Sequence, residues 1–163
     1  MNPLSLRSAD EKTLRLTGIS PVLAHCLFEL PEILRLRDQP APRRRLLQDP
    51  SPRDVEANAE WHRLIDGELQ HLFASAGETV ARDLTQLDPA SGQLDFPADH
   101  ANAWMSALNQ ARLILGAQCD VTETDMERED LDVRDPRHKA LVQIHLLGWV
   151  LHLFIDHDDE TAV

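Results

Sequence analysis

Apolar residues recur every three or four positions along most of the chain, a spacing typical of amphipathic helices. Residues 55–87 carry the longest of these stripes, and residues 97–118 and 136–157 carry two more. Gly67 and Gly77 fall within the first stripe, and glycine is a poor helix former, so this stripe predicts either one long helix or two helices joined near Gly67. The fold class that follows is all-α, a bundle of four to six helices.

Helix-start signals precede several of these stripes. A Ser, Thr or Asp side chain can accept a hydrogen bond from the first turn of a helix, and proline fits that turn because its missing N–H would have no partner there. Pro31 lies inside the first helical segment and predicts a kink or a break near Leu30. The signals are Ser20-Pro21, Ser51-Pro52, Thr122 with Asp125, and Asp135-Pro136.

Two short segments, residues 13–17 and 93–96, alternate between apolar and polar residues as a half-buried strand does. Their apolar positions could pair as one short two-stranded β-ribbon beside the helices. An isolated ribbon of two strands is marginally stable, so the alternative is that both segments stay unpaired. The pairing would join Leu14 and Leu16 to Leu94 and Phe96.

The length of 163 residues suits a single helical domain over residues 1–163. Residues 1–12 are polar and are expected to be flexible. Residues 38–52 contain four prolines and are expected to form a proline-rich basic loop. Its basic cluster is either a solvated surface or a candidate partner-binding site, because loops often carry function and prolines lower the cost of ordering. The cluster is Arg43, Arg44 and Arg45.

The chain is acidic, with 28 Asp and Glu residues against 16 Lys and Arg residues and a net charge of -12. This balance argues against nucleic-acid binding, which needs a positive surface. The first residues lack the apolar segment of a signal peptide, and the longest apolar run, residues 140–155, is short of a membrane span. Cys26 and Cys119 lie in apolar surroundings typical of reduced, buried thiols. We therefore expect a cytoplasmic protein that binds neither nucleic acid nor membrane.

Three histidines of the last helix, His138, His145 and His152, are spaced by seven residues, and Asp156 follows one turn after the last. Seven residues advance about 10.5 Å along a helix, too far for two imidazoles to share one ion, so only His152 and Asp156 can meet. Two ligands do not make a zinc site. We interpret the histidines as hydrogen-bonded side chains on a partly buried face, and expect no metal or cofactor. The alternative is a metal-binding protein or an enzyme that uses His145, His152 and Asp156.

The sequence lacks the short motifs of common hydrolases and redox proteins, namely G-x-S-x-G, H-E-x-x-H and C-x-x-C. Its carboxylates lie in runs such as residues 127–132, which is typical of a solvated surface. No catalytic residue is assigned, and the protein is not expected to be an enzyme.

The segment ALNQARLILG, residues 107–116, carries Asn109 and Arg112 beside its most apolar turn. A partly buried arginine needs a carboxylate or carbonyl partner, because an unpaired buried charge is costly. We interpret the pair as a structural polar clamp, in which Arg112 binds an acidic group within residues 120–135 and Asn109 holds a neighbouring segment. The alternative is a binding site, which would apply if Arg112 faced an open pocket without a partner.

The last helix is apolar on nearly every side over residues 140–155. Such a helix is either central in the fold or shared with a partner. Gly148 on this helix would allow a neighbouring element to approach closely. The sequence thus predicts a central last helix, with a homodimer through this helix as the alternative.

Three segments together form a recognisable pattern: W-x-x-ALN-x-x-RL-x-LG (residues 104–116) with VTE (121–123), NAEWHRL (58–64), and HLLGWV (145–150). This pattern resembles an uncharacterised, mainly actinobacterial family of bacterial proteins, domain-of-unknown-function family two-thousand-and-seventeen. The middle segment is the most specific, and the resemblance covers roughly residues 55–155.

The resemblance implies an all-helical cytoplasmic protein with no established activity. Members are often encoded beside the Clp protease adaptor, and sometimes near a metallopeptidase and a sulfur-carrier gene set, which implies an accessory role in regulated proteolysis. Some members carry a transcription-regulator label, but this acidic chain has no convincing basic recognition helix. The hypothesis is a non-enzymatic protein-interaction or regulatory accessory module with an unknown protein partner, and a transcriptional regulator is a further alternative.

Overall fold

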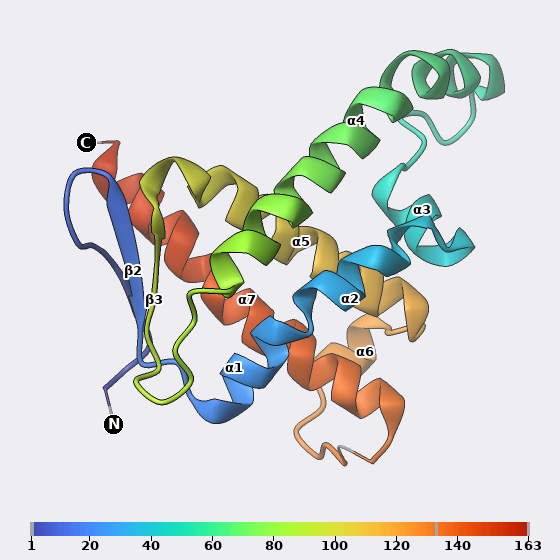
Figure 1. The fold of residues 1–163 in the computed structure, drawn as a ribbon. Helices are drawn as coiled ribbons and strands as arrows, with labels where there is room; N and C mark the ends of the chain where they lie inside the picture. Colours follow the sequence, from blue (N-terminus) through green and yellow to red (C-terminus); the bar gives the residue numbers. More distant parts are fainter. Residues whose placement is uncertain (1, 133, 163) are drawn as a thin grey trace.

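The computed structural model describes residues 2–132 and 134–162 and shows a mostly helical protein with a small sheet at one end (Figure 1). The prediction of a mostly helical fold is confirmed. The α-helices are α1 (Pro21–Phe28), α2 (Leu30–Arg35), α3 (Pro40–Leu46), α4 (Val55–Leu84), α5 (Ala101–Gln118), α6 (Glu123–Met126) and α7 (Pro136–Thr161). The 3-10 turns are η1 (Leu36–Asp38) and η2 (Ala98–His100), and the strands are β1 (Ser5–Ser8), β2 (Thr13–Thr17) and β3 (Leu94–Pro97).

The two alternating segments pair as the sequence predicts. Strand β2 runs antiparallel to β3, with Leu14 opposite Phe96 and Leu16 opposite Leu94. All four side chains are buried, so the alternation of apolar and polar positions marks the face of the sheet that covers the core.

The prediction of a two-stranded ribbon is wrong, because β1 pairs with the other edge of β2 and the sheet has the order β1-β2-β3. The prediction that residues 1–12 are flexible is wrong for β1. Leu6 lies opposite Leu16 and is buried. Pairing with β1 also satisfies backbone N–H and C=O groups of β2 that a two-stranded ribbon would leave open.

Residues 40–46 form helix α3, so the prediction of a loop over residues 38–52 is wrong for its central part. Pro40 occupies the first turn, where proline costs no hydrogen bond. Pro42 also lies near the helix start and is buried. The three arginines that follow fall in the last turn, where positive side chains interact favourably with the helix dipole. Prolines that would break a helix in its interior therefore start one here.

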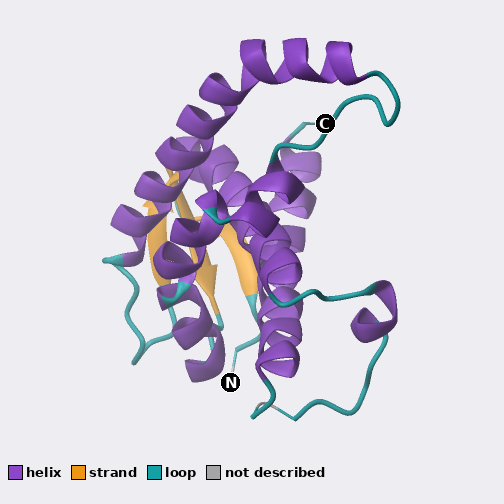
Figure 2. Ribbon diagram, turned by 90° about the vertical axis from the view of Figure 1, so that its right-hand side faces the viewer, coloured by secondary structure: helices purple, strands orange, loops and turns teal. Residues whose placement is uncertain are grey.

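The longest stripe forms one continuous helix, α4, which excludes two helices joined near Gly67. The helix start predicted at Ser51-Pro52 is wrong, because the side chain of Asp54 caps α4 instead. Ser51 binds the side chain of Asn58 through both its backbone N–H and its carbonyl, which folds the preceding segment back onto the helix. The first half of α4 projects from the body of the molecule (Figures 1 and 2).

The other predicted helix starts are confirmed. Ser20 and Asp135 cap α1 and α7 through their side chains. Thr122 and Asp125 form the capping box of α6. Helix α1 gives way to α2 at Glu29, next to the predicted break.

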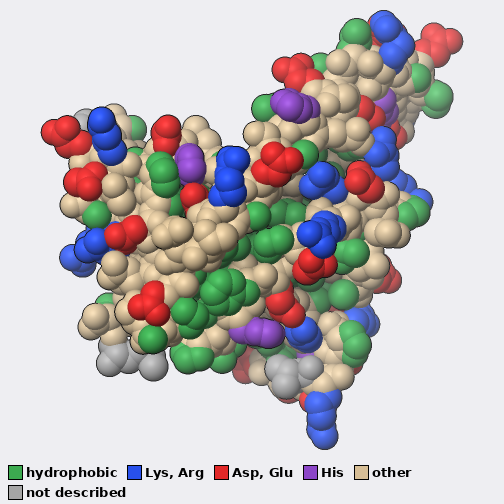
Figure 3. Space-filling view, in the orientation of Figure 1, with side chains coloured by type: hydrophobic (Ala, Val, Ile, Leu, Met, Phe, Trp, Pro, Cys, Tyr) green, Lys and Arg blue, Asp and Glu red, His purple; other side chains and the backbone are tan. Residues whose placement is uncertain are grey.

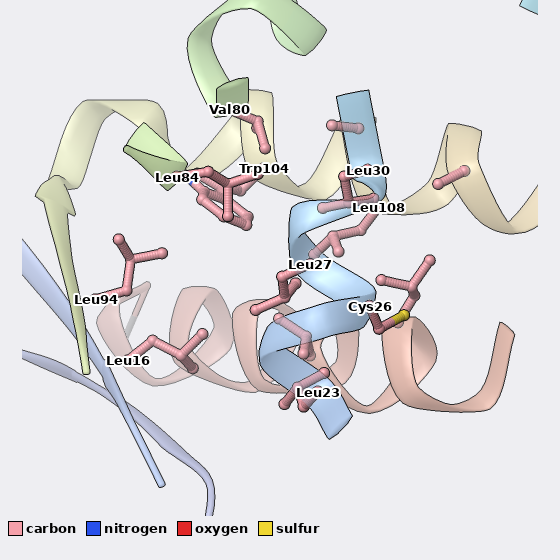
Figure 4. Close-up of a cluster of buried hydrophobic side chains, with 14 of the residues drawn as sticks. Leu16, Leu23, Cys26, Leu27, Leu30, Val80, Leu84, Leu94, Trp104 and Leu108 are labelled. Carbon is pink, nitrogen blue, oxygen red and sulfur yellow. The ribbon is translucent and has the colours of Figure 1, made fainter. Parts of the chain in front are cut away.

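The core lies where the sheet, α1, α5 and α7 meet (Figure 4). Helix α5 packs against α7, α4 and α3. The rings of Phe96, Trp104 and Phe154, from β3, α5 and α7, have centroids 5.2 to 5.9 Å apart. Aromatic contacts at this spacing are favourable beyond the area they bury, so this cluster joins the sheet to α5 and α7.

Helix α7 has a core face and an open face. By length and composition alone it could span a membrane, and 44% of its most apolar window is buried inside the fold. Leu141, Leu147 and Val150 are fully buried, whereas Trp149 and Ile155 are 68% and 43% exposed. The predicted central position therefore describes one face of the helix only.

Candidate functional site

Arg112 crosses from α5 to α7. Its Nε donates to the backbone carbonyl of Ile144 at 3.3 Å. The guanidinium lies 3.2 to 3.4 Å from the point where a Cβ on Gly148 would stand, so glycine at this position makes room for the arginine. The partner is thus a carbonyl of α7, and the prediction of an acidic partner within residues 120–135 is wrong for the part of the chain that is described.

Asn109 is exposed on α5, and its side chain forms no hydrogen bond with the residues that the structure describes. It lines, together with Arg112, a cavity of about 410 Å³ between α3, α5 and the segment before α6. Arg45 of α3 lines the same cavity. Two features that the sequence presents separately, the polar pair and the basic cluster, therefore meet at one place, which we call the Arg112 pocket.

A larger cavity, of about 670 Å³, adjoins the Arg112 pocket, because Arg112 lines both. It follows the open face of α7, and its walls are mainly apolar. A third cavity, of about 260 Å³, continues toward α1, since Val142 and Leu146 line both. We call the surface formed by the second and third cavities the α7 groove. Its apolar residues include Val22, Val142, Leu146, Trp149 and Ile155.

Exposed hydrophobic side chains support this description of the surface. Val22 of α1 is 64% exposed and lines the end of the α7 groove nearest α1. Figure 3 shows hydrophobic side chains gathered on the body of the molecule, over the region where α1 and α7 lie in Figure 1. Large contiguous patches of exposed apolar side chains often mark sites where a protein binds a partner.

The candidate metal residues lie on the open face of α7 without converging. His152 Nε2 is 3.5 Å from Asp156 Oδ2, and the two side chains are 73% and 56% exposed. His145 lines the same large cavity as His152. His138 instead forms a hydrogen bond with the backbone, because its Nδ1 accepts from the N–H of Asp132 at 2.9 Å. Within residues 2–132 and 134–162, no three His, Cys, Asp or Glu side chains are placed to hold one metal ion.

The three arginines of α3 face different surroundings. Arg43 lies 4.0 Å from the carboxylate of Asp38 and faces the side-chain amide of Gln70. Arg44 is exposed, and Arg45 reaches the Arg112 pocket. The cluster is therefore not a single basic patch, and only one of its members contributes to the candidate site.

A buried polar network that the sequence analysis missed centres on Asp83 of α4. Its Oδ2 accepts a hydrogen bond from the indole Nε1–H of Trp104 at 2.9 Å and lies 2.9 Å from Nδ1 of His100. Asp83 is only 7% exposed. The sequence does contain a sign that this carboxylate is buried, because Asp83 lies three residues after Val80 and directly before Leu84, on the apolar stripe of α4. The network joins α4 to the start of α5.

A second missed network lies at the projecting end of α4. His62 contacts Asp66 through Nδ1 at 2.8 Å and Asp49 through Nε2 at 2.7 Å. These hydrogen bonds, the one to Asp66 first, raise the pKa of His62 above its ordinary value. The imidazole thus fastens the segment that contains Asp49 to α4, and the raised pKa means that these contacts favour its protonated form.

Both cysteines are free thiols. Burial raises the pKa of Cys26 to about 12, and burial also raises the pKa of Cys119. Because the thiolate is the nucleophilic form of cysteine, burial disfavours the reactive form of both side chains.

Comparison with known proteins places most of the chain in one family model. Residues 7–157 match the model described as "Domain of unknown function (DUF2017)". No curated protein and no solved structure matches the chain. The matched region contains Arg45, Arg112 and the apolar residues of the α7 groove.

Proposed function

The chain belongs to the family described as Domain of unknown function (DUF2017), and we propose that it acts as a non-enzymatic protein-interaction or regulatory accessory module. A partner protein docks along the α7 groove. The observation that carries this proposal is Trp149, which is 68% exposed beside a cavity of about 670 Å³.

An exposed tryptophan on a rigid helix is a favourable anchor for a partner. Tryptophan dominates the energetics of many protein interfaces, usually where it enters an apolar pocket surrounded by weaker contacts. Helix α7 is held by its buried face against α5, so little conformational entropy is lost from the backbone when the open face is covered. Leu146 and Ile155 extend the apolar surface on either side of Trp149.

The process and the compartment come from the family resemblance alone. It supports a role in regulated proteolysis of the Clp type, in the bacterial cytoplasm. The alternative of a metal-binding protein or an enzyme that uses His145, His152 and Asp156 rests on the contact of His152 with Asp156 at 3.5 Å, and no group of three His, Cys, Asp or Glu side chains among the described residues is placed to hold a metal ion there.

Affinity capture with matched baits tests this proposal. The baits are the wild-type protein, Trp149→Ala, and Trp61→Ala, a tryptophan 43% exposed on the projecting half of α4 and outside the groove. We expect the same partner to be enriched by the wild-type and Trp61→Ala baits and lost with Trp149→Ala, as measured by quantitative mass spectrometry. A further bait, with Arg43, Arg44 and Arg45 changed to Ala, tests whether the basic residues of α3 contribute to binding the partner.

Three results would contradict the proposal. They are capture that is indifferent to Trp149→Ala, loss of capture with Trp61→Ala alone, and no enriched protein with any bait. A second copy of the chain as the occupant would appear instead as a concentration-dependent dimer in light scattering that Trp149→Ala dissociates.

A further inference from the structure

Among the described residues, the terminal nitrogens of Arg112 have no hydrogen-bond acceptor. A guanidinium carries five N–H donors, and Arg112 uses the one on Nε for the carbonyl of Ile144. Within the described chain, no carboxylate lies within ion-pairing distance of Arg112, and no acceptor is bound to its Nη1 and Nη2. The side chain is half-buried, so these donors face the two cavities that Arg112 lines.

The Arg112 pocket has the polar groups that an anion needs. Arg45 brings a second guanidinium and Asn109 brings an amide. Asp120 and Glu123 also line the cavity, but neither forms an ion pair with Arg45 or Arg112 among the described residues. The fork of an arginine matches a carboxylate through two parallel hydrogen bonds, which fix the orientation of the bound group.

From this arrangement we infer that the α7 groove recognises a peptide segment in which a carboxylate lies next to an apolar side chain. The carboxylate binds Arg112 and Arg45 in the Arg112 pocket, while the apolar side chain packs beside Trp149 and Leu146. Because Arg112 lines both cavities, one short segment reaches both. This inference rests on the proposed function and adds the chemistry of the partner.

The shape of the site favours a peptide over a free small acid. Small-molecule sites enclose most of the ligand surface, whereas the larger cavity is an open groove that continues toward α1. The formal charges of Arg45 and Arg112 are balanced by Asp120 and Glu123 on the same cavity, so recognition of a carboxylate rests on the N–H donors of Arg112 that have no acceptor among the described residues.

Selection of random dodecapeptides displayed on phage tests the inference without any knowledge of the natural partner. The targets are the wild-type protein, Arg112→Met, Arg45→Met, Trp149→Ala and Arg44→Met. The last is the matched control, because Arg44 neighbours Arg45 on α3 but does not line the pocket. We expect wild-type and Arg44→Met to enrich peptides with Asp, Glu or a terminal carboxylate next to apolar residues. Arg112→Met should keep the apolar preference and lose the acidic one.

The dissociation constants of a selected peptide and of its Asp→Asn or Glu→Gln counterpart then measure how much the carboxylate contributes to binding. Loss of a charge-assisted hydrogen bond weakens binding about tenfold or more, so the amide peptide should bind the wild-type protein at least that much more weakly. The two peptides should bind Arg112→Met equally. Should Arg112→Met fail to fold, Arg45→Met and the NMR signal of the Arg112 Nε–H in the wild-type protein replace it, and that signal should shift with the acidic peptide only.

The outcomes separate the inference from the proposed function. Apolar peptides without an acidic preference, or an acidic preference that survives both arginine substitutions, overturn the inference and leave the docking proposal standing. Acidic peptides that bind independently of Trp149 support the carboxylate site and overturn docking along the groove. Binding of free N-acetylaspartate as tight as that of the peptide overturns the peptide as the ligand, and no enrichment on any target overturns both.

Discussion

Asp83 shows how one side chain can hold two elements together in an otherwise apolar core. Its buried carboxylate accepts a hydrogen bond from the indole of Trp104 and also contacts Nδ1 of His100 at 2.9 Å. The same indole belongs to the aromatic cluster with Phe96 and Phe154. The polar network and the apolar cluster therefore both fix the orientation of the Trp104 ring.

Replacing Asp83 by Ala should lower the free energy of unfolding by about 2–4 kcal/mol, because it leaves a buried indole N–H without an acceptor. Asp83→Asn should cost less, since its amide oxygen can still accept that hydrogen bond. Urea denaturation measures both. Glu78→Ala, at an exposed site on the same helix, is the control and should change stability by less than about 0.5 kcal/mol. Equal effects of Asp83→Ala and Glu78→Ala would contradict a structural role for the network.

At this scale the sequence indicates which residues are unusual, but not their partners. The position of Arg112 beside an apolar turn correctly signals a half-buried charge. Its hydrogen bond to Ile144 depends on how α5 crosses α7, and helical periodicity within one segment carries no information on that crossing. Asp83 was open to the same reasoning, since an acid on an apolar stripe needs a buried donor.

Among the elements, the first half of α4 is attached to the segment that connects it to α3. The segment between them returns along α4 and is held by the backbone of Ser51 on Asn58 and by Asp49 on His62. Only the second of these contacts changes with pH. The segment before α4 is therefore held to the helix by one contact that does not depend on pH, between Ser51 and Asn58, and by one that depends on the charge of His62.

The attachment through His62 should weaken as pH rises. Because the folded pKa of His62 is raised, its contribution to stability is fully present below the ordinary histidine pKa of about 6.5 and is lost as pH rises through the folded value. Hydrogen exchange of residues 47–54, corrected for intrinsic rates, should show more protection at pH 6 than at pH 8.5. His62→Gln should abolish this difference. Protection that is equal at both pH values in the wild-type protein would contradict this role for His62.

Element boundaries followed from the sequence where one side chain decides them locally. Ser20, Thr122 and Asp135 cap their helices as predicted. Ser51 does not, because Asn58 captures its backbone and Asp54 is the better acceptor three residues later. Competition between neighbouring caps is settled by contacts that a list of preferred residues does not contain.

For the molecule as a whole, the sheet closes one end of the helical body. Helix α7 packs against β1, and Arg15 of β2 joins Asp95 of β3 through two hydrogen bonds of 2.8 and 2.7 Å. The sequence predicted β2 and β3 because apolar and polar residues alternate along each of them. It did not show β1, because a single buried leucine in four residues makes no pattern.

Leu6→Ala tests whether β1 belongs to the cooperative fold. The substitution removes a buried side chain and should lower the free energy of unfolding by about 2 kcal/mol. Arg7→Ala, at an exposed position of the same strand, should have a much smaller effect. Thermal and urea denaturation give the comparison. If Leu6→Ala is as mild as Arg7→Ala, β1 is only loosely attached to the core.

The pairing of β2 with β3 also sets the order in which the chain can fold during synthesis. Arg15 and Asp95 are 80 residues apart, which ribosomes need about 4–16 s to make at 5–20 residues per second. The hairpin of β1 and β2 therefore emerges early, with its apolar face uncovered until β3 arrives and Phe154 of α7 completes the aromatic cluster. A nascent chain in this interval exposes leucines that the finished protein hides, and chaperones that bind nascent chains would meet it there first.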